Sequence, residues 1–336
     1  MVRVALTILV SVLVGVAVAA APAGTDKYPA RITSLPAPFS PEGVAIDHRQ
    51  FFAGNTATGG IFTGDLQGDP GHYLVPGVTD GSSSAFGIFP DRRGRLWVAG
   101  GGTGNAYVYD ERSGQLLAKY VLEPGTPKRI NDVYVTKDAA YFTCGSTVCF
   151  EPTALYRVAI DRGGKLSDPN DPASVTKIHL TGIPTPTGPR DGLNGIRGWD
   201  HDRMLIVGQT GTGKLWAVDP ETGAATNIPL VNQNGDPELV PTNDGFVIAH
   251  NKLAFSVSNQ TAGYIAAIRF AKDIGSGTVL AHLGNPDFPL QNPSTVDFVD
   301  GERQLYVLAR DRNNPTLPVG LTRIDVPKNK DLESDD

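Results

Sequence analysis

The chain has 336 residues, of which 40% are apolar and 19% are charged, and its formal net charge at pH 7 is −6. An acidic chain without a run of lysine or arginine does not suit nucleic acid or an anionic membrane surface, so neither is expected as a partner. An apolar fraction of this size in a chain of this length can bury a large core.

The N-terminus is typical of a secretory signal peptide. Arg3 precedes an apolar run from Val4 to Ala20, and small residues suitable for cleavage follow. This order predicts a signal peptide over residues 1–22 and a secreted protein with no membrane association after cleavage. An uncleaved membrane anchor is the alternative, because the run is close to the ~18-residue lower limit for crossing a bilayer.

Short alternating apolar runs recur after the N-terminal segment, separated by turns rich in Gly, Pro, Asp and Asn. Six units begin at residues 42, 87, 131, 194, 244 and 295, and in each a second apolar run follows the first. No long stretch after residue 25 has helical periodicity, so the pattern predicts an all-β chain.

Six units of this length fit a six-bladed β-propeller, which we place over residues 23–327 as one domain. The last unit has three clear strands, and the run 30–35 near the N-terminus is expected to supply the fourth and close the ring. The acidic segment 328–336 is expected to be a disordered tail.

Four of the six units place an oxygen-bearing side chain at the same position, just before the first apolar run. They are Glu42, Asn131, Asn194 and Asp244. Because the innermost strand of each blade lines the central channel, we expect these side chains to converge at one end of it. Two carboxylates and two carboxamides suit a hard cation such as Ca²⁺ or Mg²⁺ better than zinc. Taken singly, each could equally be a turn residue, since Asn-Gly and Asp-Gly are common turn sequences.

Other polar residues are expected near the same ring. Ser84, Ser294 and Thr295 come from the second and sixth units, and their hydroxyls could bind water or substrate. A single N-glycosylation sequon begins at Asn259. Asn259 follows the second run of its unit, and antiparallel pairing brings the end of that run to the same end of the channel, so it should flank the mouth.

The two cysteines, Cys144 and Cys149, follow the second run of the third unit and should also flank the mouth. In an oxidising compartment a disulfide that closes a tight loop is the default. Free thiols are the alternative.

The order and phase of these motifs resemble those of the regucalcin, gluconolactonase and luciferin-regenerating-enzyme family, which are calcium-dependent hydrolases with six-bladed propellers. The motifs are Pro-Glu-Gly at Glu42, Arg-x-Asn-Asp at 129–132, Asn-Gly at Asn194 and Asp-Gly at Asp244. The resemblance implies that Glu42, Asn194 and Asp244 hold the cation and that Asp244 is also the catalytic acid/base. It further implies that Asn131 lies beside the metal or contacts substrate, and that Arg129 helps to bind substrate.

The activity implied is hydrolysis of a small-molecule lactone or ester that depends on Ca²⁺, or alternatively on Mg²⁺ or another divalent cation. The cation would polarise the carbonyl oxygen, while Asp244 would take a proton from the attacking water and return it to the leaving alkoxide. Two alternatives stay open. One is a metal-dependent phosphotriesterase, and the other is a non-enzymatic secreted propeller whose cation is structural or vestigial.

Overall fold

The computed structural model describes residues 27–33, 35–68, 70–125, 129–145, 149, 151, 153–185, 188, 191–250, 252–299, 303–309 and 319–327. The signal peptide expected over 1–22 and the tail expected over 328–336 lie outside the described residues. Among the residues described, no helix is long and apolar enough to cross a membrane.

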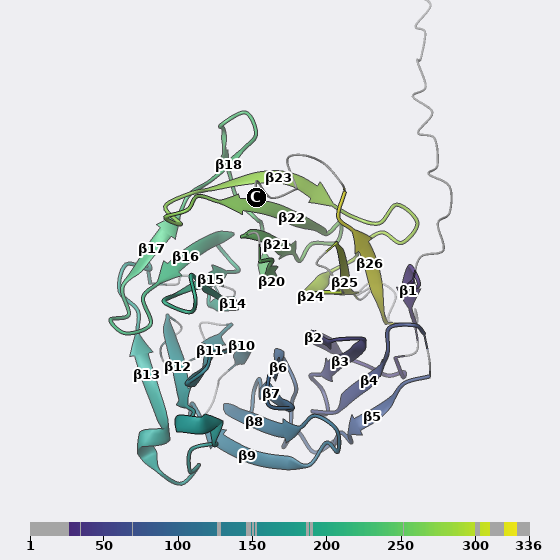
Figure 1. The fold of residues 1–336 in the computed structure, drawn as a ribbon, viewed down its shortest axis with the longest axis vertical. Helices are drawn as coiled ribbons and strands as arrows, with labels where there is room; N and C mark the ends of the chain where they lie inside the picture. Colours follow the sequence, from purple (N-terminus) through teal and green to yellow (C-terminus); the bar gives the residue numbers. More distant parts are fainter. Residues whose placement is uncertain are drawn as a thin grey trace, which may run out of the picture.

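Six sheets stand around a central axis, which confirms the all-β six-bladed propeller (Figure 1). In each blade the first strand lies innermost, and each of the four main strands pairs antiparallel with the next one outward. Blade 1 contains β2 (Pro41–Asp47), β3 (Gln50–Asn55), β4 (Ile61–Asp65) and β5 (His72–Val75). Blade 2 contains β6 (Ile88–Asp91), β7 (Arg95–Ala99), β8 (Asn105–Asp110) and β9 (Leu116–Val121). Blade 3 contains β10 (Ile130–Val135), β11 (Ala139–Cys144), β12 (Ala154–Ala159) and β13 (Val175–His179).

Blade 4 contains β14 (Leu193–Trp199), β15 (Met204–Gln209), β16 (Lys214–Val218) and β17 (Ala225–Ile228). Blade 5 contains β20 (Asn243–Ile248), β21 (Leu253–Ser258), β22 (Tyr264–Phe270) and β23 (Gly277–Leu283). The short strands β18 (Leu230–Asn232) and β19 (Pro237–Glu238) extend its outer edge, with β18 parallel to β23. Blade 6 contains β24 (Pro293–Phe298), β25 (Gln304–Ala309), β26 (Gly320–Asp325) and β1 (Arg31–Ile32). Two 3₁₀ helices, Arg162–Gly164 and Pro172–Ser174, lie between β12 and β13.

The core is divided among the interfaces between neighbouring blades. Six clusters of buried apolar side chains fill the six interfaces, one cluster for each pair of adjacent sheets. Consecutive side chains of one strand point into the two interfaces on either side of their sheet: Phe51 packs against blade 6 and Phe52 against blade 2. This alternation is the period of two that a β-strand imposes on its side chains. Because both faces of each sheet are covered, the inner strands are apolar on both sides.

The ring closes between the two ends of the chain. Arg31 pairs with Thr322 and Ile32 with Leu321, so the N-terminal strand completes the last blade, as expected from the sequence. Nearer the axis, the Ile46 amide donates to Asp297 Oδ2 at 2.7 Å and joins blade 1 to blade 6.

The Cys144–Cys149 disulfide is confirmed. It ties the end of β11 to the segment that precedes β12, and both cysteines are buried.

Candidate functional site

Four inner strands contain one extra residue at the same point, and β24 has a related register shift between Pro293 and Thr295. In blade 1, Pro41 pairs with Asn55 and then Val44 with Ala53, so β2 advances three residues while β3 advances two. The same shift occurs between residues 130 and 133 of β10, 193 and 196 of β14, and 243 and 246 of β20. These four β-bulges contain the four residues at the repeated sequence position. A bulge interrupts the regular alternation of a strand and re-aims a side chain, and bulges are common next to active sites.

Glycine follows the site residue in three of these bulges because neighbouring blades approach closely near the axis. A Cβ on Gly43 would lie 2.1 Å from the Phe86 carbonyl oxygen of blade 2, and one on Gly195 would lie 2.7 Å from the Asp244 carbonyl oxygen of blade 5. Any side chain at these positions would push two blades apart.

The bulges open into a pocket of about 100 Å³ at one end of the channel. Its lining residues are Glu42, Arg129, Gly145, Asn194, Thr210, Thr242, Asp244 and Asn259. The structure thus brings together residues from four blades. Glu42, Asn194 and Asp244 lie in the inner strands of blades 1, 4 and 5, and Arg129 lies just before the inner strand of blade 3. Their roles as ligands, base or substrate-binding groups stay predictions.

Asn131 is buried beside the pocket and is not part of its lining. Gly145 is in the lining, and a Cβ on it would lie 2.4 Å from Asn131 Nδ2. That nitrogen is buried and has no hydrogen-bond partner among the described residues. The side-chain amide of Asn131 therefore has an unused hydrogen-bond donor directly behind Gly145, which forms part of the pocket wall.

The electrostatics of the pocket centre on two buried carboxylates. Burial raises the pKa of Asp244 well above its usual range, and the nearby charge of Glu42 raises it further. A hydrogen bond from Asn259, the charge of Arg129 and a hydrogen bond from Asn194 act in the opposite direction. Two negative charges in one small pocket repel each other, and a positive charge there would stabilise both. Arg129 supplies part of that positive charge.

A strained segment supports Asp244. Asn259 Nδ2 donates to Asp244 Oδ2 at 2.5 Å, and the Asn259 backbone is fixed in turn by Thr242. Thr242 has a φ of 50°, an unfavourable conformation for a β-branched residue. Strain of this kind persists only where the surroundings enforce it and is concentrated at functional sites.

Three polar lining residues were given no ligand, catalytic or substrate-binding role from the sequence. Thr210 accepts a hydrogen bond from Asn194 Nδ2 at 3.0 Å, Thr242 positions the backbone of Asn259, and Asn259 itself contacts Asp244. The sequence drew attention to Asn259 as a sequon expected to flank the mouth of the channel, and Asn259 does line the pocket. A glycan would be attached to the same nitrogen that now bonds to Asp244, so the two roles compete.

The hydroxyl groups expected to bind water or substrate donate to the main chain instead. Ser84 donates to the Thr56 carbonyl at 2.7 Å. Ser294 and Thr295 both donate to the Glu42 carbonyl, at 2.7 and 2.8 Å. These last two bonds cross the closure of the ring and fix the backbone of Glu42.

A second group of charged residues, buried or half-buried and not assigned to a site from sequence, lies along the inner strands. Arg197 Nη1 lies 3.1 Å from Asp132 Oδ2, and burial raises the pKa of Asp297 to about 6. Asp132 also accepts a hydrogen bond from the Ile196 amide at 3.2 Å and Asp297 accepts one from the Ile46 amide at 2.7 Å, so these carboxylates join neighbouring inner strands.

The pocket does not contain a conventional cluster of metal ligands. In the part of the chain that the structure describes, no group of three or more His, Cys, Asp or Glu side chains could hold a metal ion. A cation here would depend on two carboxylates completed by amide oxygens. Such a donor set fits Ca²⁺, which accepts carboxylate, amide and water oxygens in irregular geometry.

No protein-family model and no curated protein matches the chain. Solved structures do match. The major allergen Mala s 1 of Malassezia sympodialis has a TM-score of 0.66 at 16% identity, covering 88% of this chain and 96% of that one. A luciferin-regenerating enzyme has a TM-score of 0.57 at 13% identity, covering 89% and 94%. The calcium-binding protein regucalcin of Agrobacterium tumefaciens has a TM-score of 0.55 at 15% identity, covering 89% and 96%. At these identities the likeness shows the fold alone.

Proposed function

We propose that the pocket binds a divalent cation, with Ca²⁺ as the first choice, and that the protein hydrolyses a small-molecule lactone or ester in the manner of gluconolactonases. The observation that carries this proposal is the burial of Glu42 and Asp244 in one pocket together with the amide of Asn194. Two structurally similar proteins support it, one named as an enzyme and the other as a calcium-binding protein.

Glu42, Asp244 and Asn194 would hold the cation, with Asn131 as a further candidate behind Gly145. The bound cation would polarise the carbonyl of the ester and stabilise the negative charge that develops on its oxygen. Burial and Glu42 raise the pKa of Asp244, which fits a carboxyl group that takes up and releases a proton during the reaction. The hydrogen bond from Asn259 fixes the orientation of the Asp244 carboxylate while the reacting group enters.

The size of the pocket limits the substrate. A volume of about 100 Å³ admits a single functional group, so the remainder of the substrate would lie outside at the rim. The exposed Arg129, whose guanidinium lies 5.3 Å from the centre of the Phe86 ring, would contact that outer part. We also propose that the protein is secreted, which the disulfide supports because disulfides persist in oxidising compartments.

A non-enzymatic binding propeller is the second candidate. It is favoured by the contacts that Asp244 already makes to Asn259 and Asn194 and by the charge of Arg129, which stabilise the carboxylate without catalysis. Metal-dependent phosphotriester hydrolysis is a third, since it would use the same oxygen ligands.

Thermal unfolding with EDTA and then with Ca²⁺, Mg²⁺ or Zn²⁺, followed by a panel of γ- and δ-lactones, separates these functions. Calcium stabilisation with lactone turnover is the expected result. Stabilisation without turnover of lactones or phosphotriesters would leave a structural cation, and no stabilisation by any cation would exclude the proposed metal site.

A further inference from the structure

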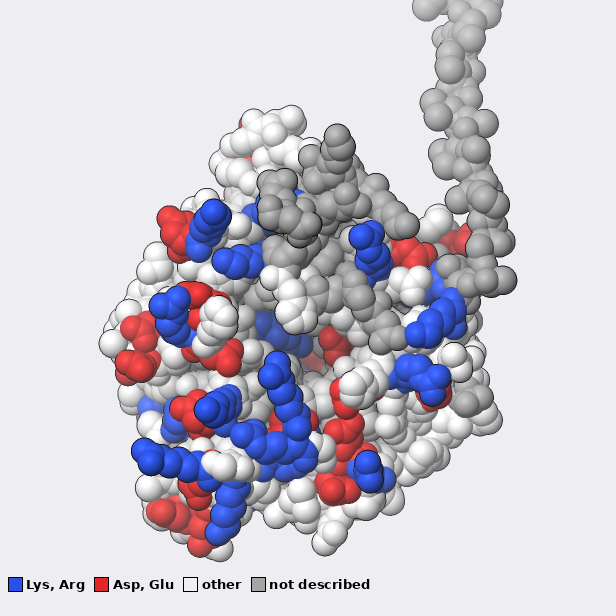
Figure 2. All heavy atoms as spheres, viewed as in Figure 1, with Lys and Arg blue, Asp and Glu red and all other residues white. Residues whose placement is uncertain are grey.

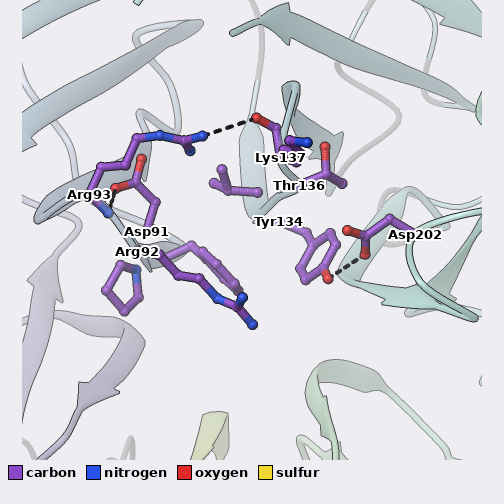
Figure 3. A pocket seen from close by; sticks show the side chains of 10 residues that line it. Asp91, Arg92, Arg93, Tyr134, Thr136, Lys137 and Asp202 are labelled. Atoms are coloured by element: carbon purple, nitrogen blue, oxygen red, sulfur yellow. Dashed lines mark hydrogen bonds between the residues drawn. The ribbon is translucent and has the colours of Figure 1, made fainter. Parts of the chain in front are cut away.

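A second hollow, of about 610 Å³, lies at the opposite end of the blades from the candidate site. The inner strands β6 and β10 run away from the mouth of the channel, so the turns that follow them lie at the other end. The β6–β7 and β10–β11 turns form the hollow between blades 2 and 3 (Figure 3). Hollows of this volume are in the range that receives small molecules.

Basic side chains surround this hollow. Figure 3 shows the Arg92 guanidinium extending into it from one side, with Arg93 and Lys137 on the other. Lysine and arginine side chains also gather over the blades of β6–β9 and β10–β13 on the face seen in Figure 2. Neither the Arg92 guanidinium nor the Lys137 ammonium forms a hydrogen bond or ion pair with any residue that the structure describes.

The equivalent turns of other blades differ in this respect. Their cations are matched within the protein: Arg49 with Asp65 at 3.5 Å in blade 1, Arg203 with Asp200 at 2.5 Å in blade 4, and Lys252 over the Trp199 ring at 5.4 Å in blade 5. The comparison shows that a basic residue in this turn normally finds a partner on its own or the adjacent blade. Arg92 and Lys137 have no such partner among the described residues, so both side chains are available to a ligand.

The carboxylates in the hollow do not neutralise these cations. Asp91 Oδ2 accepts hydrogen bonds from Arg95 Nε at 2.7 Å and from Trp97 Nε1 at 2.9 Å, and the Arg95 Nη2 atom of the same ion pair lies 2.6 Å away. The negative charge of Asp91 is therefore balanced by the buried Arg95 and not by the cations of the hollow. Asp202 accepts the Tyr134 hydroxyl hydrogen at 2.7 Å, so one carboxylate faces three cationic side chains.

Two aromatic rings, set nearly at right angles to each other, line the hollow. The rings of Phe89 and Tyr134 pack edge to face with centroids 5.2 Å apart. Burial and the hydrogen bond to Asp202 raise the pKa of Tyr134, so its hydroxyl stays protonated and its ring stays in place. A fixed pair of rings beside an unpaired guanidinium provides both an apolar surface and a charge.

We propose that this hollow binds a small organic anion, with a carboxylate or phosphate group on Arg92 and a flat apolar ring against Phe89 and Tyr134. A guanidinium presents paired N–H groups that match the oxygens of either anion. Arg93 and Lys137 lie at the far rim and add to the positive field that attracts the ligand. The site is separate from the pocket at the mouth and does not depend on a cation there.

The test is titration calorimetry on the full protein in EDTA, with benzoate and phenyl phosphate as anionic probes and benzamide and benzyl alcohol as neutral ones. We expect an anionic probe to bind about tenfold more tightly than its neutral analogue, because a charge-assisted hydrogen bond contributes about that factor. Whichever of benzoate and phenyl phosphate binds more tightly identifies the anion. Inorganic phosphate alone should bind more weakly than phenyl phosphate, because it makes no contact with the rings.

The variants locate the site. Arg92→Gln should weaken anion binding about tenfold and Lys137→Gln about twofold, since only the first loses a direct contact. Arg49→Gln removes a paired arginine from the equivalent turn and should leave binding unchanged, as should Asp244→Asn at the other end. Thermal unfolding should be unaltered in Arg92→Gln because this side chain is exposed. Equal binding by Arg92→Gln and the unmodified protein, equal binding of charged and neutral probes, or no binding of either anion would overturn the proposal.

Discussion

Asn259 donates a hydrogen bond from its side-chain nitrogen to Asp244 Oδ2 at 2.5 Å, and this nitrogen is also the atom to which an N-linked glycan would be attached. The hydrogen bond stabilises the ionised form of a carboxylate whose pKa is otherwise raised by burial and by Glu42. A glycan on Asn259 would replace one of the two hydrogens on that nitrogen and place a sugar at the entrance to the pocket.

Asn259→Ala should therefore raise the pKa of Asp244 further. Because a cation binds the ionised carboxylate, tight calcium binding should need a higher pH in this variant. At neutral pH the calcium affinity should fall about tenfold, the factor expected for a hydrogen bond to a charged group. Thr261→Ala is the matched control, because it destroys the sequon and leaves Asn259 in place. Calcium titrations at several pH values would check this, and identical behaviour of the two variants would show that the hydrogen bond has no role.

Glu42→Gln and Asp244→Asn should each abolish stabilisation by calcium without unfolding the domain. A ligand at a hundred times its dissociation constant contributes about 2.7 kcal/mol, and this increment should disappear in both variants. In EDTA both variants should be at least as stable as the unmodified protein, since each removes one of two like charges from a buried pocket. The measurement is chemical unfolding with and without calcium. A variant that keeps the full calcium increment would remove that residue from the site.

Stability in EDTA should decrease as the pH rises through the acidic range. Burial raises the pKa of Asp297 from 3.8 to about 6, so the folded protein binds a proton that the unfolded chain releases between these values. The stabilisation is complete below pH 3.8 and is lost as the pH rises to about 6, amounting to about 3 kcal/mol. Urea unfolding across this range should show a smaller slope for Asp297→Asn. An identical slope for the variant would assign the pH dependence to other groups.

The Cys144–Cys149 disulfide should stabilise both the fold and the pocket. Its sequence separation of 5 closes a short loop, for which chain entropy predicts about 2 kcal/mol. Gly145 adjoins Cys144 and lines the pocket, so Cys144→Ser with Cys149→Ser should also weaken cation binding. Unfolding and calcium titration of this double variant measure the two effects. Loss of stability with unchanged affinity would confine the disulfide to a structural role.

Gly43→Ala should destabilise the propeller because its Cβ would lie 2.1 Å from the Phe86 carbonyl oxygen of the next blade. Overpacking of this kind costs roughly 1–3 kcal/mol. Gly102→Ala is the control, since a Cβ there would have no atom of the described residues within 4 Å. Thermal unfolding of the two variants compares them directly, and an equal small effect would mean that the blades can separate at the bulge without cost.

The fold was predictable because a propeller repeats one local pattern. Alternating apolar runs between polar turns, as in 86–99, predict strands whose two faces are both buried. Six such units in one chain are compatible with few folds, of which the propeller is the simplest. The inner ring was predictable for the same reason, since Glu42 and Asp244 occupy one position of the repeat. Three of the four bulges left a trace in the sequence, the glycine that follows the site residue.

What the sequence did not reveal depends on contacts between blades. Thr295 donates to the carbonyl of Glu42 across 253 residues, and no local pattern marks such a bond. The same holds for Asp132 with Arg197, and for Asn259, whose sequon suggested an exposed surface. That Asn131 lies behind Gly145 could not be inferred either, because it depends on how the end of β11 passes the bulge of β10.

The pairing of β1 with β26 determines when the ring can close. Three strands of blade 6 come from the end of the chain and the fourth from its beginning, so a growing polypeptide can complete the other blades and still lack this one. Until β26 has been synthesised, the apolar flanks of blades 1 and 5 face solvent. Loss of either terminal strand should therefore harm folding yield more than the stability of the finished protein suggests, because the open ring is the species most exposed to aggregation.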